Sequence, residues 1–257
     1  MVEGLLTNTV SWLLVFARMG GMLGMNPLFS RRNVPAGVRA GMTLLFTVLV
    51  APGVSAVAVT GLDSLGLALA LLRELFVGLA CGFVFQIYYY MLFFVGDWMD
   101  MHFGLSMAKV FDPGTSIQAS MSGNLLNAMF LLYFFATDSH LLLIRIFIDS
   151  FRILPVGAVS LSAETPQFFI ELFIAAFSMI LRLALPFVAA EVVLELITGV
   201  LMKLIPQIHV FVINMQMKVA LGFILLLAFS GPITSFLDNY MRVMLENMQW
   251  AFSAMGA

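Results

Sequence analysis

The sequence predicts an all-α integral membrane protein with about six long, kinked hydrophobic helices, since each membrane helix needs about 20 apolar residues. Of the 257 residues, 62% are hydrophobic and only 10% are charged, and the mean hydropathy is +1.05. A soluble domain carries about 25% charged residues, so this chain has too few charges to cover a surface that faces water. We therefore expect membrane lipid to surround much of it.

The charge balance and the rare residue types exclude several classes of protein. A net charge of −2 argues against a broadly basic surface and therefore against nucleic-acid binding. Cys81, the single cysteine, lies in an apolar stretch, so neither a disulfide framework nor a cysteine-based metal site is predicted. His102, His140 and His209 are scattered without ligand spacing. We predict no metal and no cofactor.

Polar or turn-forming stretches divide the chain into apolar segments. Residues 137–140 interrupt the fourth segment, and Pro186 lies inside the fifth, where the missing amide N–H should kink a helix. Thr165 and Pro166 are typical of a helix start, with threonine as the N-cap and proline at the first helical position. The predicted segments are 5–29, 41–60, 65–95, 124–148, 167–204 and 210–229.

The last part of the chain, residues 233–252, predicts an amphipathic helix that lies on a surface or packs on a partner. Its polar residues fall on one face and its apolar residues on the other. The apolar positions are Phe236, Leu237, Tyr240, Met241, Met244, Leu245, Met248 and Phe252, and the polar positions are Asp238, Asn239, Arg242, Glu246 and Asn247.

Residues 104–123 form a small, polar segment rich in glycine and serine between two long apolar stretches. This composition predicts neither a stable helix nor a lipid-facing surface. Irregular backbone is tolerated inside a membrane only where protein buries it or where it lines a water-filled space. We therefore expect the segment inside a cavity or pore. An ordinary loop outside the membrane is an equal alternative on composition alone.

Several charged residues lie within or beside apolar segments. Asp97, Asp100, Lys109 and Asp112 either line a hydrophilic path or are solvated, and solvation is the preferred interpretation for Asp97. Arg18 is expected to pair with an acid that the sequence does not identify, and Glu74 is expected near a membrane interface.

Glu191 and Glu195 are four residues apart and therefore share a helical face. A charge at the bilayer centre costs about 2.5–3.5 kcal/mol on insertion scales, so both carboxylates need partners. A proton or cation relay is one interpretation. We prefer a contact with another subunit along a polar seam, because no further acid in the later segments extends a relay.

Three functional classes compete on these observations. A structural channel subunit without catalysis fits the polar segment and the lack of nucleotide, triad or metal motifs. A small secondary transporter fits the polar segment and the two glutamates, but such transporters usually contain internal repeats, and none is evident. An intramembrane enzyme would have to use Ser106 and His102, for which the sequence indicates no supporting geometry.

A series of stretches, in order along nearly the whole chain, resembles the FliR family of flagellar biosynthetic proteins, which includes the export-gate T subunit of virulence type III secretion systems. Ser139 and Gln216–Met217 depart from the family pattern. The stretches that carry the resemblance are 26–39, 51–52, 78–83, 100–113, 138–143 and 206–222.

The resemblance implies a subunit of a type III export gate in the bacterial inner membrane, at the flagellar basal body. One copy of the chain would join FliP and FliQ in a helical hetero-oligomer, next to FlhA and FlhB, and admit unfolded export substrates. Residues 1–165 would be the FliP-like part, and residues 166–257 a FliQ-like hairpin with the amphipathic helix. A virulence secretion gate is the alternative within the same family.

The resemblance also implies that residues 104–123 form the plug of the export pore. Glycine and serine allow unusual backbone conformations, and the apolar side chains of the segment could seal the pore by dewetting. The residues expected to form the plug are Gly104, Ser106, Met107, Phe111, Asp112, Pro113, Thr115 and Gln118.

Overall fold

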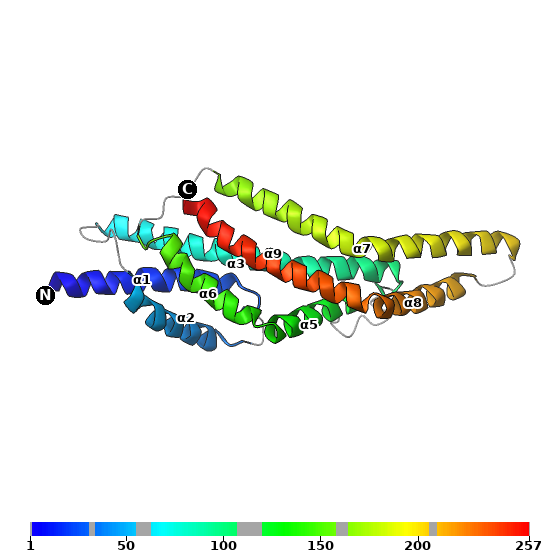
Figure 1. Ribbon diagram of the computed structural model, residues 1–257, viewed down its shortest axis with the longest axis horizontal. Coiled ribbons are helices and arrows are strands. Elements are labelled where there is room, and N and C mark those ends of the chain that lie inside the picture. Colours follow the sequence, from blue (N-terminus) through cyan, green and yellow to red (C-terminus); the bar gives the residue numbers. More distant parts are fainter. Residues whose placement is uncertain are drawn as a thin grey trace. The chain divides into compact units, whose positions relative to one another are not determined.

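The computed structural model describes residues 2–30, 34–54, 63–106, 120–157, 164–205 and 210–256. All regular structure in these ranges is helical (Figure 1), which confirms the all-α class. The elements are α1 (Val2–Met25), α2 (Ala36–Val50), the 3₁₀-helix η1 (Ala51–Gly53), α3 (Ser64–His102), α5 (Met121–Ala136), α6 (Ser139–Ile153), α7 (Thr165–Leu204), α8 (Val210–Ala228) and α9 (Ser230–Gly256).

Within the described part of the chain, three helical stretches are long and apolar enough to cross a membrane. They are 36–53, which joins α2 to η1, and the helices α3 and α7. Two further pairs are bent at a short break, by 74° between α5 and α6 and by 63° between α8 and α9. If each bent pair is one span, the candidates number up to five. The stretch Thr9–Met25 of α1 is apolar but shorter.

Several helix boundaries differ from those predicted. α2 begins at Ala36 instead of residue 41, and α3 continues to His102 instead of ending at 95, so it includes Asp97 and Asp100. The prediction that 104–123 is not helical is wrong at its end, because α5 begins at Met121. The Ser120 hydroxyl accepts a hydrogen bond from the Gly123 amide at 2.9 Å, and serine is a favoured N-cap.

The predicted interruptions and helix start occur close to their expected positions. α5 ends at Ala136 and α6 begins at Ser139, and between them Asp138 has a φ of 57°, a left-handed conformation that aspartate tolerates better than most residues. α7 begins at Thr165 and continues through Pro186. Figure 1 shows a change in the direction of α7 near its middle.

The C-terminal helix α9 has the predicted amphipathic pattern, but its apolar face is buried within this chain. Leu237, Tyr240, Met244 and Met248 are buried, whereas the predicted polar positions are exposed or half-buried. The expectation that this face lies on a membrane surface or a partner is therefore wrong. Periodicity identifies which face is apolar, but it cannot identify the surface that covers it.

The chain divides into two compact units. Unit 1 contains residues 1–88, 138–173 and 242–257, and unit 2 contains residues 89–137 and 174–241. The unit boundaries fall within α3, α7 and α9, and between α5 and α6. This division by compactness does not test the predicted division at residues 165 and 166, which concerns family relationship and stays a prediction.

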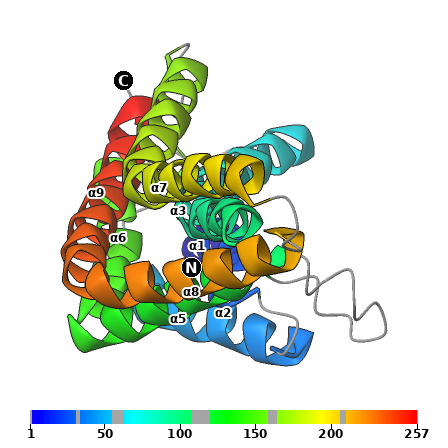
Figure 2. The same cartoon turned by 90° about the vertical axis from the view of Figure 1, so that its right-hand side faces the viewer.

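In unit 1, α1 packs against the first part of α3, and Figures 1 and 2 both show these helices side by side. Small residues allow the two backbones to approach. A Cβ atom at Gly21 would lie 2.6 Å from the carbonyl oxygen of Leu75, and one at Gly78 would overlap the carbonyl oxygen of Arg18. Close helix pairs in membranes commonly use small residues in this way.

In unit 2, aromatic side chains fill the space between the helices. The Phe187 ring on α7 lies 6.1 Å from the Phe103 ring and 5.3 Å from the Phe229 ring, centroid to centroid. Phe103 follows directly after α3, and it lies so close to Gly222 of α8 that a Cβ there would be 2.7 Å from its ring. This packing holds the start of residues 104–123 against α7 and α8.

We predict that Gly78→Ala destabilises the protein by about 1–3 kcal/mol, the usual cost of overpacking. The added methyl group would force α1 away from α3. Gly24→Ala on α1 is the matched control, since no atom lies within 4 Å of the position that its Cβ would occupy. The thermal-unfolding midpoint in detergent is the measurement. Equal midpoints for the two variants would contradict the close approach.

Candidate functional site

Four charged side chains are at most 1% exposed in the described part of the chain. They are Arg18 and Glu74 in unit 1, and Asp100 and Glu191 in unit 2. Charged groups inside membrane helices are costly and usually mark a functional or structural site. The partners of each group show what it can do.

Arg18 and Glu74 form a buried ion pair in unit 1. Arg18 Nε lies 2.5 Å from Glu74 Oε2, and Arg18 Nη1 donates to the carbonyl oxygens of Ser150 at 3.0 Å and Leu154 at 2.8 Å. Glu74 Oε1 accepts the Gly157 amide at 2.9 Å. Glu74 is therefore the acid that the sequence could not identify. Its predicted position near a membrane interface stays a prediction.

The Arg18 guanidinium also lies over the ring of Phe151, 4.6 Å from its centroid. Its contacts with the carbonyl groups at the end of α6 place a positive charge at the negative end of the helix dipole. Arg18 therefore connects three helices of unit 1: α1, α3 and α6.

Asp100 of α3 holds the first turn of α5, the far end of residues 104–123. Asp100 Oδ2 accepts the Ser120 hydroxyl at 2.7 Å and the Met121 amide at 2.6 Å. Oδ1 accepts the Ser122 amide at 3.1 Å. The first amides of a helix have no partner within the helix, and a carboxylate there is favoured by the helix dipole. Asp97 is exposed, as expected.

Two glycines allow α3 and α5 to approach each other closely beside the Asp100 hydrogen bonds. A Cβ atom at Gly96 of α3 would overlap the backbone of Gly123 in α5. The close approach and the Asp100 hydrogen bonds together join the start of α5 to the last turns of α3. The residues that follow position 119 are therefore attached to the same helix, α3, that ends just before Phe103.

Of the predicted plug residues, Gly104 and Ser106 lie in the described part of the chain. Gly104 has a φ of +72°, which only glycine adopts at little cost, and it turns the chain away from α3. The Ser106 hydroxyl is buried without a hydrogen-bond partner among the described residues. The other predicted plug residues, Met107, Phe111, Asp112, Pro113, Thr115 and Gln118, lie outside the described ranges.

Glu191 and Glu195 share one partner, which the sequence analysis missed. Lys218 Nζ of α8 lies 2.7 Å from Glu191 Oε1 and 2.7 Å from Glu195 Oε1. The Glu191 side chain is 1% exposed, whereas that of Glu195 is 58% exposed. A lysine inside an apolar segment is itself a signal for a buried acid, and that signal could have predicted the pairing.

This cluster of Glu191, Glu195 and Lys218 joins α7 to α8 beside the start of the polar segment. A Cβ atom at Gly104 would lie 3.9 Å from the Lys218 Cβ. Lys218 neutralises the buried carboxylate of Glu191 from within the chain, and the predicted subunit contact at Glu191 stays a prediction. Glu195 remains exposed, so the predicted subunit contact there stays a prediction.

No group of three or more histidine, cysteine, aspartate or glutamate side chains in the described ranges has metal-binding geometry. His102 instead packs edge-on against Trp98, with ring centroids 5.9 Å apart. The polar groups described above bind helix ends and one another. Their arrangement attaches the described residues on either side of 107–119 to packed helices.

Comparison with known proteins decides the family. The model of the bacterial export proteins, family 1, matches residues 9–244. The chain belongs to this family. The match covers most of the chain, including both attachment points of the polar segment and the cluster of Glu191, Glu195 and Lys218.

Two flagellar biosynthetic proteins FliR are similar to this chain. That of Bacillus subtilis is 28% identical over 249 residues, which cover 96% of each chain. That of Escherichia coli is 27% identical over 234 residues, 90% of this chain and 89% of the relative. The Yop proteins translocation protein T of Yersinia pestis is 26% identical over 211 residues, 81% of each chain.

We predict that Asp100→Ala frees the first turn of α5. Loss of a hydrogen bond to a charged group costs about 1.5–3 kcal/mol, and three donors lose their acceptor here. The measurement is hydrogen exchange at the Met121 and Ser122 amides, which should become faster. Asp97→Ala is the matched control, because Asp97 is exposed on the same helix. Unchanged exchange at both amides in Asp100→Ala would contradict the attachment.

We predict that Lys218→Met destabilises the protein by about 3–5 kcal/mol, since removing one partner of a buried pair leaves an uncompensated charge. Lys218→Met combined with Glu191→Leu should recover much of the loss in thermal-unfolding midpoint. Glu195→Gln, at an exposed position, should change the midpoint little. If the double variant were no more stable than Lys218→Met, Glu191 would not be the group that needs the lysine.

Proposed function

We propose that this protein is a structural channel subunit of a type III export gate and takes part in flagellar protein export. Membership of the bacterial export family, with a match over residues 9–244, carries this proposal. The FliR relatives align with almost the full chain, which favours the flagellar system. A virulence secretion gate is the alternative, supported by the similarity to the Yersinia protein.

In this proposal the chain works without catalysis. One copy joins FliP and FliQ in a helical hetero-oligomer in the inner membrane, with FlhA and FlhB nearby, and unfolded substrates pass through the shared pore. Up to five candidate spans with many exposed apolar side chains support a membrane location and contacts with other subunits. Energy for transport comes from other components or from the proton gradient.

Residues 104–123 act as the plug of this pore. Both ends of the segment are attached to firmly packed elements, by Asp100 at the start of α5 and by Phe103 against Gly222 of α8. A plug needs this combination, because a seal has to remain in place while its attachment survives opening. The proposed sealing residues include Met107 and Phe111, and Gly104 supplies the turn that directs the segment away from α3.

A small secondary transporter is less consistent with the geometry. A relay needs carboxylates that exchange protons or cations along a path. Here Lys218 neutralises Glu191 and contacts Glu195 at the same distance. A fixed ion pair is a structural link between α7 and α8, and it leaves the buried carboxylate unavailable to a transported cation.

We predict that replacing residues 107–119 by a short Gly-Ser linker makes the membrane leak ions while the complex still assembles. The replacement keeps Ser120, Gly123 and the Asp100 contacts, which a deletion of the whole segment 104–123 would remove. The ends can be joined, because the Asp100 carboxylate at the end of α3 directly contacts Ser120. Ion flux across cells and co-purification with two other small hydrophobic subunits are the measurements.

The two measurements test different parts of the proposal. Unchanged permeability in a complex that assembles would argue against the plug. A wild-type chain that purifies alone or as a simple homo-oligomer would argue against the export gate and for the transporter. A linker of the same length as residues 107–119 but with their apolar side chains restored is the matched control, and it should reduce the leak.

A further inference from the structure

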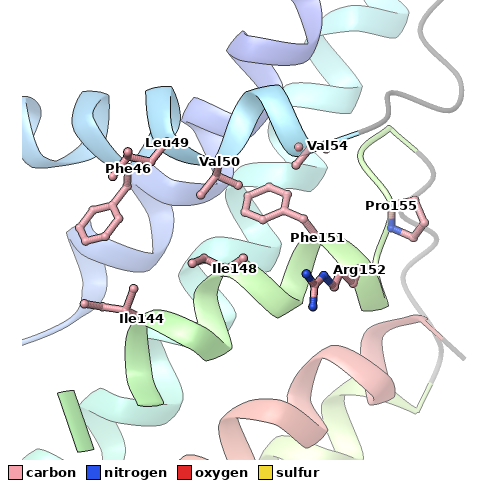
Figure 3. Close-up of a pocket in the computed structure, with 10 residues that line it drawn as sticks. Phe46, Leu49, Val50, Val54, Ile144, Ile148, Phe151, Arg152 and Pro155 are labelled. Atoms are coloured by element: carbon pink, nitrogen blue, oxygen red, sulfur yellow. The ribbon is translucent and has the colours of Figure 1, made fainter. Parts of the chain in front are cut away.

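Unit 1 contains an apolar hollow between α2 and α6 that the proposed export function does not use. Its volume is about 450 Å³, within the range of about 300–1,000 Å³ that is typical of ligand pockets. Figure 3 shows Phe46 and Val50 of α2 facing Ile148 and Phe151 of α6 across the hollow. A hollow of this kind suits a hydrocarbon chain.

One charged side chain of α6 lines this hollow, and two further charged side chains of α6 form a group with it. Arg152 lines the hollow, and Arg145 lies two turns earlier on the same helix. Their side chains are 80% and 77% exposed, and both contact Asp149, at 3.2 Å and 3.8 Å. Two cations share one carboxylate, so the group has a net charge of +1. Exposed ion pairs of this kind are weak, which leaves both guanidinium groups able to bind an anion.

A tryptophan on the other side of Arg152 indicates where this part of α6 lies in a membrane. Arg152 also lines a second hollow, together with Trp250 of α9, whose side chain is 68% exposed. Tryptophan is enriched at membrane–water interfaces, at the depth of the lipid headgroups. The helices beside the first hollow belong to candidate spans: α2 with η1, and α5 with α6.

We propose that the hollow between α2 and α6 binds one acyl chain of an anionic phospholipid, with its phosphate on Arg152 and Arg145. The apolar lining packs against the hydrocarbon chain, and the net positive charge attracts the phosphate of the headgroup. Basic pockets between membrane helices bind anionic headgroups in this way. Charge complementarity therefore favours an anionic lipid over a zwitterionic one.

Native mass spectrometry of the full-length chain, in whichever complex it purifies with, tests this proposal with phosphatidylglycerol and phosphatidylcholine as probes. Phosphatidylglycerol should bind more tightly. Arg152→Gln should weaken phosphatidylglycerol binding about fivefold, the effect expected for one basic side chain near an anionic lipid surface. It should leave phosphatidylcholine binding unchanged. High salt should reduce the difference between the lipids. Ile148→Trp, which narrows the hollow, should weaken the binding of both lipids.

Arg242→Gln is the matched control. Arg242 lies on α9, is 62% exposed and pairs with Glu246 at 2.9 Å, but it does not line the hollow, so its replacement should leave phosphatidylglycerol binding unchanged. Equal affinity for the two lipids, or an equal loss in Arg242→Gln and Arg152→Gln, would overturn the proposal. So would full competition by soluble glycerol phosphate, or a purified complex in which another subunit covers the hollow and excludes lipid.

Discussion

The pairing of buried charges with one another and with two helix ends determines much of this structure. In a low-dielectric environment an unpaired amide, carbonyl or charge is costly. Asp100 accepts three donors at the start of α5, and Arg18 donates to two carbonyl groups at the end of α6. The negative group binds a helix N-terminus and the positive group a C-terminus, as the helix dipole favours.

These two contacts explain how the broken pair α5 and α6 is held at both of its outer ends. Each helix is too short to span a membrane by itself, and the chain turns by 74° between them. Their packing therefore depends on charges supplied by α3 and α1 within the respective units. The cost of burying Asp100 and Arg18 is offset because each satisfies several polar groups that would otherwise lack partners.

Glycine residues also contribute to the packing of these helices, because they allow two helix backbones to come into direct contact. Gly78 lets α3 lie directly against α1, and Gly96 lets it lie directly against the start of α5. Without a hydrophobic driving force between helices in lipid, such close backbone contact is a main source of packing energy. In unit 2, the described residues on both sides of 107–119 therefore belong to packed elements.

Composition alone was enough to predict the all-α membrane class, because too few charges leave no soluble alternative. The break at 137–140 and the polar face of α9 were also predictable, since they depend on local residue types and on helical periodicity. The groups that contact Arg18, Glu191 and α9 could not be predicted from the sequence. Glu74, Lys218 and the surface under α9 are distant in sequence, and only the packed fold brings together groups that no spacing rule relates.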